Sequence, residues 1–216
     1  MCKYNTVIFD LDGTLTDPAI GITNSVAYAL KKWGIEVADR KELYKFIGPP
    51  LLDSFGNYYG FSREDSERAV GYFREYFSTK GMFENSVYND IPEVLSELRT
   101  RGKKLIVATS KAEVFAKQIL EYFGLDGYFD FVSGATLDSS MVEKADVIDY
   151  ALKSCGVDNI SDIVMIGDRE FDVFGAKHFG MDSVGVLYGY GSCEELAAAG
   201  ATYIAEKPLD ILNFVK

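Results

Sequence analysis

Four short polar segments of the sequence each follow an apolar run and carry groups that could do chemistry. The first holds Asp10 and Asp12, directly after the apolar residues 6–9. Two carboxylates two residues apart at the end of a strand point the same way, because side chains alternate between its faces. Such a pair can act as a nucleophile with a general acid and base, or it can hold a metal ion. A plain turn rich in Asp and Gly would also explain this segment alone.

The second and third segments add groups that suit a phosphate ester. Thr109 and Ser110 follow the apolar run KLIVA and precede a predicted helix, whose N-terminal N–H groups would attract a phosphoryl oxygen. A simple helix cap is the other explanation for these two residues. Lys144 falls in the first turn of another predicted helix, where a cation opposes the helix dipole. Either a function in a site or a solvated surface position accounts for that lysine.

The fourth segment places Asp168 at the end of an apolar run and Asp172 four residues later. Two carboxylates at this spacing on one helix face repel each other unless a cation lies near them. Asp168 could instead cap the helix.

The elements that would position these segments alternate along the second half of the chain. Strands are predicted at residues 6–9, 104–109, 129–133, 163–166 and 183–186, and helices at 92–101, 112–122, 144–154 and 170–179. Repeated strand–helix units of this spacing predict an α/β fold, a parallel three-layer Rossmann-like sheet with helices on both faces. All four polar segments then lie at the carboxyl ends of strands, where such sheets bind ligands. Their carboxylates, hydroxyls and lysine are the components of Mg²⁺-assisted phosphoryl transfer.

A block of helical patterns interrupts this alternation. Helices are predicted at residues 20–32, 40–46, 51–59 and 62–77, with residues 13–17 and 79–84 as linkers. The last helix begins with a capping box formed by Ser62 and Asp65. We therefore expect residues 1–15 and 82–216 to form the α/β core, and residues 16–81 to form an inserted helical domain.

Over its whole length the sequence resembles the haloacid dehalogenase (HAD) superfamily. Residues 10–15, DLDGTL, resemble its first motif, and residues 107–111, VATSK, its second. Lys144 resembles the third motif, although Ala145 stands where the family often has proline. Residues 167–172, GDREFD, resemble the fourth. The insert resembles the C1-type helical cap, and the chain as a whole resembles the phosphoglycolate phosphatase-like branch.

The resemblance implies a role for each of these residues. Asp10 would be the nucleophile that forms an aspartyl-phosphate, and Asp12 the general acid and then base. Thr109, or its neighbour Ser110, would bind the phosphoryl group. Lys144 would bridge nucleophile and phosphate, with Lys111 as the alternative lysine.

The same resemblance implies a Mg²⁺ site. Asp168 would hold the ion together with Asp10 and the backbone carbonyl of Asp12. Asp172 would be a ligand directly or through water.

Asp12 also limits the class of reaction that the chain is expected to catalyse. Protonation of a leaving alkoxide contributes roughly 10²–10⁴-fold to a rate, and a phosphomonoester releases such an alkoxide. The dehalogenase and phosphonatase branches resemble this chain but lack that acid. We therefore expect a phosphatase acting on a small phosphomonoester such as phosphoglycolate. The alternatives are a nucleoside 5′-monophosphatase and β-phosphoglucomutase-like phosphoryl transfer. A silent binding module of the same fold would lack Asp10 or Asp168, and both are present.

Composition limits the partners. Lys and Arg number 22 against 33 Asp and Glu, a net charge of −11, and no basic cluster is visible. A nucleic-acid partner is not expected, because binding it depends on positive charge. No apolar run approaches a membrane span and no signal pattern precedes the first strand. The unpatterned cysteines Cys2, Cys155 and Cys193 are typical of reduced thiols, which favours a cytoplasmic protein. We expect a small phosphorylated metabolite as ligand and a monomer or homodimer.

Overall fold

The computed structural model describes residues 3–138 and 140–216, and it divides into two compact units. Met1–Asp17 and Val87–Lys216 form the first, called here the core unit. Pro18–Ser86 form the second, called here the inserted unit. The candidate site residues Asp10, Asp12, Thr109, Ser110, Lys144, Asp168 and Asp172 all belong to the core unit.

The core unit is built on a six-stranded sheet with the order β5-β4-β1-β6-β7-β8. Its strands are β1 (Thr6–Phe9), β4 (Lys104–Ala112), β5 (Phe131–Ala135), β6 (Ile163–Gly167), β7 (Asp182–Val186) and β8 (Tyr203–Ala205). Every neighbouring pair is parallel, which confirms the predicted α/β class. The chain builds the sheet outward in opposite directions on the two sides of β1. That reversal opens a crevice beyond the carboxyl end of β1, where such folds bind ligands.

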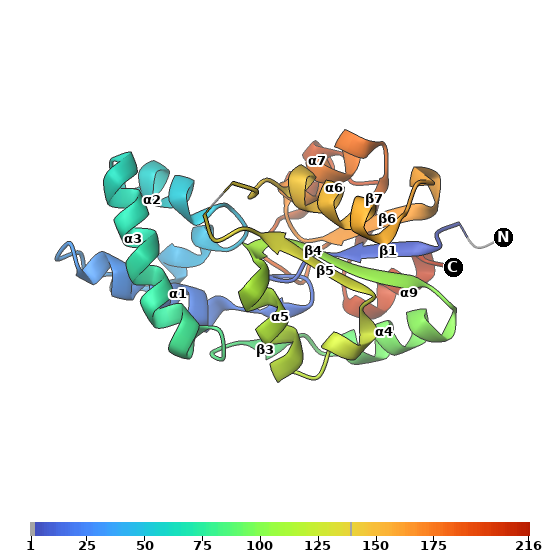
Figure 1. Ribbon diagram of the computed structural model, residues 1–216, viewed down its shortest axis with the longest axis horizontal. Coiled ribbons are helices and arrows are strands. Elements are labelled where there is room, and N and C mark those ends of the chain that lie inside the picture. Colours follow the sequence, from blue (N-terminus) through green and yellow to red (C-terminus); the bar gives the residue numbers. More distant parts are fainter. Residues whose placement is uncertain (1–2, 139) are drawn as a thin grey trace. The chain divides into compact units, whose positions relative to one another are not determined.

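Helices cover both faces of this sheet (Figure 1). On one face lie α6 (Lys144–Cys155) and α7 (Glu170–Phe179), and on the other α4 (Ile91–Thr100), α5 (Glu113–Tyr122) and α9 (Ile211–Phe214); α8 (Cys193–Ala199) packs against α7. Short 3-10 turns lie at Asp126–Tyr128, Ile160–Asp162 and Pro208–Asp210. Ile8, Ile106 and Met165 bury one face of the sheet against Val147 and Ile148 of α6.

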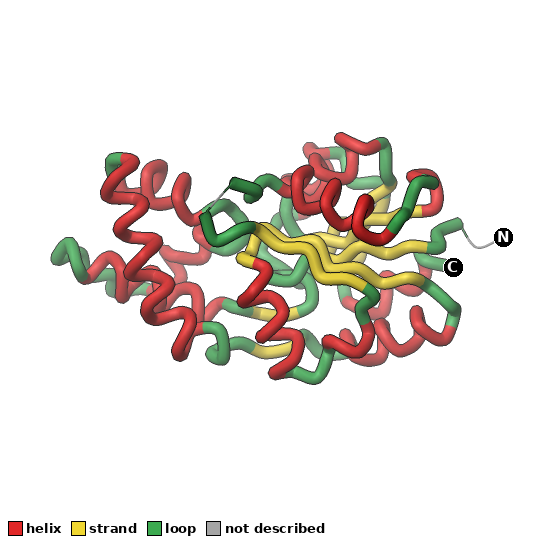
Figure 2. The backbone as a smooth tube through the Cα atoms, viewed as in Figure 1, coloured by secondary structure: helices red, strands yellow, loops and turns green. Residues whose placement is uncertain are grey.

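The inserted unit is built of helices that lie between Ala19 and Gly81. It comprises α1 (Ala19–Lys31), the 3-10 helix η1 (Arg40–Phe46), α2 (Leu51–Tyr59), α3 (Arg63–Tyr76) and the π-helix η2 (Phe77–Gly81). The predicted cap at Ser62 is confirmed, because its hydroxyl accepts the backbone N–H of Asp65 at 3.1 Å. The linker expected at residues 79–84 is wrong in its first part, since η2 continues the helix to Gly81. Figure 2 shows the helical run of this segment and the strands of the core unit.

Two short strands that the sequence did not predict pair with each other, β2 (Thr16–Asp17) and β3 (Ser86–Val87). Two predicted strands also have ends that are wrong by two residues or more. Strand β4 continues to Ala112 instead of ending at residue 109, and β5 covers Phe131–Ala135 instead of 129–133.

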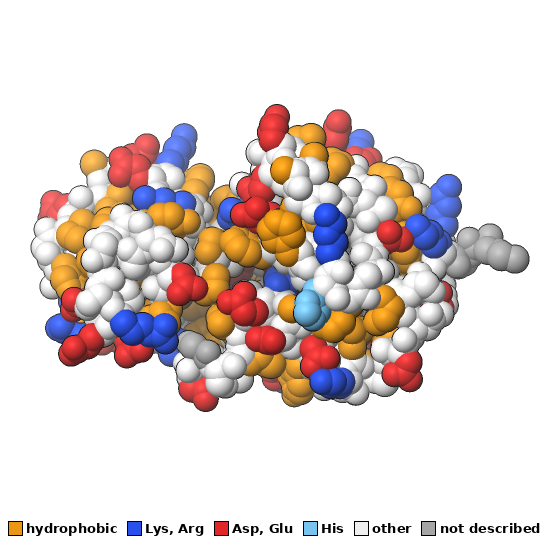
Figure 3. Space-filling view, turned by 90° about the horizontal axis from the view of Figure 1, so that it is seen from above, with side chains coloured by type: hydrophobic (Ala, Val, Ile, Leu, Met, Phe, Trp, Pro, Cys, Tyr) orange, Lys and Arg blue, Asp and Glu red, His pale blue; other side chains and the backbone are white. Residues whose placement is uncertain are grey.

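Three features bear on the partners and the location that the composition suggested: the charges of the surface, the state of the cysteines and the apolar length of the helices. On the face drawn in Figure 3, Lys and Arg side chains are scattered among acidic ones. Cys155 and Cys193 are free thiols, and Cys2 lies outside the described residues. None of the helices in the described ranges is both long and apolar enough to cross a membrane.

Candidate active site

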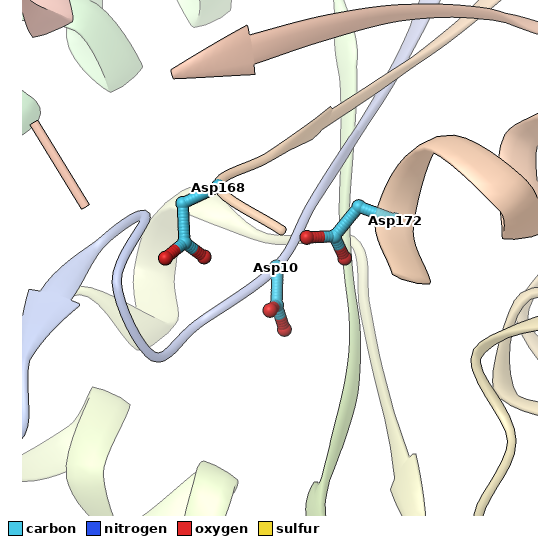
Figure 4. A group of neighbouring side chains, drawn as sticks. All are labelled: Asp10, Asp168 and Asp172. Atoms are coloured by element: carbon cyan, nitrogen blue, oxygen red, sulfur yellow. The ribbon is translucent and has the colours of Figure 1, made fainter. Parts of the chain in front are cut away.

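Three carboxylates converge at the carboxyl ends of β1 and β6. Asp10 directly follows β1, and its backbone N–H donates to the carbonyl of Ile166 at 2.9 Å, so the chain leaves the sheet alongside β6. Asp168 directly follows β6, and Asp172 lies in the first turn of α7. Each offers an oxygen, and these oxygens lie within 4.8 Å of one another (Figure 4). All three side chains are buried.

Lys144 joins two of these carboxylates. Its Nζ lies 2.9 Å from Asp10 Oδ1 and 2.8 Å from Asp172 Oδ1, and it donates to the carbonyl of Ala108 at 3.2 Å. Burial lowers the pKa of Lys144, but the charges of Asp10 and Asp172 outweigh it and hold that pKa above its usual value. The lysine at the start of α6 is therefore a buried cation of the site, not a solvated surface residue.

Asp12 forms a separate ion pair. Its Oδ2 lies 2.8 Å from Nζ of Lys111, and both side chains are nearly buried. Burial raises the pKa of Asp12, while Lys111 acts to lower it. Asp12 Oδ1 is buried and has no hydrogen-bond partner among the described residues. That oxygen is thus available to a group that enters the site.

The structure corrects the expectation for Thr109 and Ser110. They do not start a helix: β4 continues past them, and α5 begins at Glu113 with Ala112 as its N-cap residue. Thr109 is buried, and its Oγ1 accepts the backbone N–H of Lys111 at 3.2 Å. Ser110 is partly exposed.

The alternative that Asp168 caps the following helix is wrong. Arg169 occupies the N-cap position of α7, and Asp172 Oδ2 accepts its backbone N–H at 3.1 Å. Asp168 instead accepts the backbone N–H of Tyr190 at 2.8 Å and the hydroxyl of Thr14 at 3.4 Å. Oxygens of the Asp168 and Asp172 carboxylates still lie within 4.8 Å of each other, although only Asp172 belongs to the helix.

Burial and mutual repulsion act on the acidic cluster. Burial raises the pKa of Asp168 well above its usual range, and the charges of Asp172 and Asp10 raise it further. Burial also raises the pKa of Asp172 to about 6, against the opposing effect of Lys144. The negative charges of these carboxylates are thus not fully balanced by positive groups of the protein.

A simple charge count shows what would compensate them. The four carboxylates of Asp10, Asp12, Asp168 and Asp172 carry −4 when ionised, and Lys111 and Lys144 supply +2, which leaves −2. The nearby Arg169 is paired with Glu195, at 2.8 Å. A cluster of hard oxygen donors with two uncompensated charges fits one small divalent cation such as Mg²⁺.

Two glycines make room for these side chains, a role that the sequence analysis did not predict. A Cβ at position 167 would lie 2.1 Å from Cγ of Asp172, and one at position 175 would lie 2.7 Å from Cγ of Lys144. Gly175 sits inside α7, where glycine is usually unfavourable. That glycine within a predicted helix was the available sequence signal for a close approach.

Comparisons with known proteins cover nearly the whole chain. A family model described as haloacid dehalogenase-like hydrolase matches residues 7–186. The chain is 44% identical over 201 residues to a 5′-nucleotidase of Pseudomonas aeruginosa, across 93% of this chain and 90% of that protein. It is 39% identical over 198 residues to the tyrosine-protein kinase PtkA of Mycobacterium tuberculosis, across 92% of this chain and 67% of PtkA. The crystal structure of a predicted phosphatase from Clostridium acetobutylicum matches with a TM-score of 0.94 and 52% identity, across 97% of this chain and 99% of that one.

Proposed function

We propose that this chain, which belongs to the haloacid dehalogenase-like hydrolase family and is a phosphatase, uses Asp10 as a nucleophile in Mg²⁺-dependent hydrolysis of a small phosphomonoester. One observation carries the proposal: Asp10 lies at the switch point of the sheet, with Lys144 2.9 Å away and Asp168 and Asp172 beside it. A buried carboxylate next to a cation can approach a phosphoryl group that carries negative charge.

Two steps follow from this arrangement. An oxygen of Asp10 attacks phosphorus, the ester P–O bond breaks, and protonated Asp12 gives its proton to the leaving oxygen. The raised pKa of Asp12 suits a group that must hold a proton before this step. A water then attacks phosphorus, Asp12 takes up its proton, and the Asp10–phosphorus bond breaks to release phosphate. Thr109, or its neighbour Ser110, and Lys144 would bind the phosphoryl oxygens throughout.

The metal would be held by carboxylate oxygens of Asp10 and Asp168 and by the backbone carbonyl of Asp12. Asp172 would bind it directly or through water. When bound, Mg²⁺ would neutralise charge on the phosphoryl group and orient it. The protein's share is to keep these oxygens together in a buried, preorganised set.

Two classes of small phosphorylated metabolite are candidate substrates. Phosphoglycolate fits the branch that the sequence resembles. The 44% identity to a 5′-nucleotidase of Pseudomonas aeruginosa favours nucleoside 5′-monophosphates as the other class. We also propose that the inserted unit is the C1-type cap that selects among them, because in lidded enzymes the closing part excludes water and contacts the substrate.

The test is phosphate release from a panel of substrates: phosphoglycolate, several nucleoside 5′-monophosphates, β-glucose 1-phosphate and pyrophosphate. Each is measured with Mg²⁺, with a chelator, and with Asp10→Asn as the blank. We expect Mg²⁺-dependent release from a phosphomonoester that disappears in the blank. Release that persists in Asp10→Asn or in chelator would overturn the proposal, and preferential conversion of β-glucose 1-phosphate to an isomer would favour a mutase.

A further inference from the structure

The segment between β7 and α8 has no charged side chain, yet it contacts the acidic cluster directly. Its sequence over residues 188–191 is Tyr-Gly-Tyr-Gly, and it is called here the 188–191 segment. The backbone N–H of Tyr190 donates to Asp168 Oδ2 at 2.8 Å. The hydroxyl of Tyr188 donates to the carbonyl of Thr14 at 3.0 Å, and that of Tyr190 donates to Asp17. The segment thus joins Asp168 to the loop that follows Asp10 and Asp12.

The two glycines of this segment leave no space for a side chain. A Cβ at position 189 would lie 2.4 Å from Cβ of Asp168 and 2.4 Å from the carbonyl oxygen of Gly13. A Cβ at position 191 would lie 2.0 Å from the carbonyl oxygen of Asp168. Such contacts are far shorter than ordinary van der Waals distances. The backbone of the segment therefore packs directly onto Asp168.

Gly13 also packs directly against Asp168. Its φ of 84° lies in the left-handed region, and a Cβ there would lie 2.2 Å from Asp168 Oδ2. Three glycines, at positions 13, 189 and 191, thus bring backbone against one buried carboxylate. Nothing in turn formation alone requires all three to converge on the same side chain.

Helix α8 holds the far end of the segment in place. Glu195 Oε1 accepts the Arg169 Nε–H at 2.8 Å and the backbone N–H of Glu170 at 3.0 Å. The segment therefore runs between two anchored points, the end of β7 and the start of α8. Its position relative to Asp168 is fixed at both ends.

We propose that the 188–191 segment is the positioning element of the metal site. Gly189 and Tyr190 fix the direction in which Asp168 presents its carboxylate. Tyr188 holds the loop of residues 10–17 at a fixed position relative to Asp168. The proposal rests on the proposed function, because it takes Asp168 to be a Mg²⁺ ligand. Groups that orient a metal ligand typically change metal affinity by roughly 10–100-fold when they are altered.

The first test is Mg²⁺ binding to the Gly189→Ala protein, measured by isothermal titration calorimetry without substrate. Gly127→Ala is the matched control, because a Cβ there meets nothing within 4 Å. We expect Gly189→Ala to weaken Mg²⁺ binding by roughly 10-fold or more, and the control to bind as the wild type does. A purely structural role would lower the melting temperature of the metal-free protein but leave the Mg²⁺ affinity unchanged.

Tyr188→Phe provides a milder second variant in case Gly189→Ala does not fold. It removes the hydrogen bond to Thr14 but keeps the ring, which packs against Tyr88 with 5.0 Å between centroids. We expect its Mg²⁺ affinity to fall by roughly threefold to tenfold, as for the loss of one hydrogen bond.

The outcomes separate this inference from the proposed function. Wild-type Mg²⁺ affinity in both folded variants would overturn the positioning role and leave the metal site standing. Absence of Mg²⁺ binding in the wild type would overturn the proposed metal site and the positioning role with it.

Discussion

Lys111 Nζ lies 2.8 Å from Asp12 Oδ2. The lysine of the VATSK motif therefore forms an ion pair with the second aspartate of the DLDGTL motif. Lys144 instead contacts Asp10 and Asp172. The two lysines considered for one role in the sequence therefore meet different carboxylates. This arrangement supports Lys144 as the partner of the proposed nucleophile and Lys111 as the partner of the proposed general acid.

Replacing Lys144 with methionine should affect both stability and activity. The variant leaves two buried carboxylates without their cation, which typically costs about 3–5 kcal/mol in the free energy of unfolding. Loss of a charge that faces the phosphoryl group should lower kcat by roughly 10²-fold or more. Urea unfolding and steady-state kinetics measure the two effects. Lys153→Met, at an exposed position of the same helix, is the control, and equal behaviour of both variants would contradict the assignment.

Replacing Lys111 with methionine should change the dependence on the leaving group. The variant removes the cation that orients Asp12 and lowers its pKa. Asp12 then becomes a weaker and less well placed acid, so proton donation to the leaving oxygen should suffer. An aryl phosphate releases a stable phenolate and needs little protonation, whereas an alkyl phosphate needs it. We therefore expect the alkyl ester to lose roughly 10-fold more activity than the aryl ester. Equal losses would rule out a role through Asp12, and Lys117→Met, exposed on α5, should leave both rates unchanged.

Mg²⁺ should stabilise the wild-type protein and not Asp168→Asn. A ligand at about 100 times its Kd adds about 2.7 kcal/mol, which raises the melting temperature of a chain of this size by roughly 5–10 °C. Differential scanning calorimetry with Mg²⁺ and with chelator measures the shift. The metal-free variant should melt no lower than the metal-free wild type, because the substitution removes a poorly compensated buried charge. A full Mg²⁺ shift in Asp168→Asn would place the ion elsewhere.

The metal-free protein should become more stable when the pH falls from about 7 to about 5. The pKa of Asp172 is about 6 in the folded protein and that of Asp168 is raised well above the usual range, while both are near 4 in the unfolded chain. Between these values the folded state binds more protons than the unfolded state, so stability decreases as the pH rises. Urea unfolding in chelator across this range measures the slope. Asp172→Asn should show a smaller slope, and an unchanged slope would contradict the assignment.

The strands at the centre of the sheet were predictable because both of their faces are buried, which demands a continuous apolar run. Strand β1 has the predicted bounds, and so does α7, whose end is marked by Gly180. Strand β4 was predicted too short. A register shift between Thr109 and Ala112 lets the chain rejoin β5 at Ala135. That pairing depends on tertiary contacts, which the local sequence does not show. The polar residues within the shift also resemble the start of a helix, so the strand was ended too early.

The carboxylates of the site were predictable for a different reason. Parallel strands bring their carboxyl ends to one edge, so Asp10 and Asp168 had to lie near each other whatever the details. The family resemblance implied that Lys144 contacts Asp10, as it does here. The pairing of Lys111 with Asp12 was not predictable, because it depends on the local path of β4 and the direction of each side chain. The 188–191 segment was missed, since tyrosines and glycines after a strand resemble an ordinary turn. Its alternating glycines were the only available signal.

The most direct test of the central claim is to find the phosphoryl group on Asp10. The Asp12→Asn protein with Mg²⁺ and an aryl phosphate should form the intermediate, because this leaving group needs no acid, and should hydrolyse it slowly, because the base is missing. Acid quenching and peptide mass spectrometry locate the modification. We predict one added phosphoryl group on Asp10, removed by hydroxylamine and absent from Asp10→Asn/Asp12→Asn. A phosphoryl group on another residue, or phosphate release with an unmodified Asp10 throughout the first turnover, would contradict the mechanism.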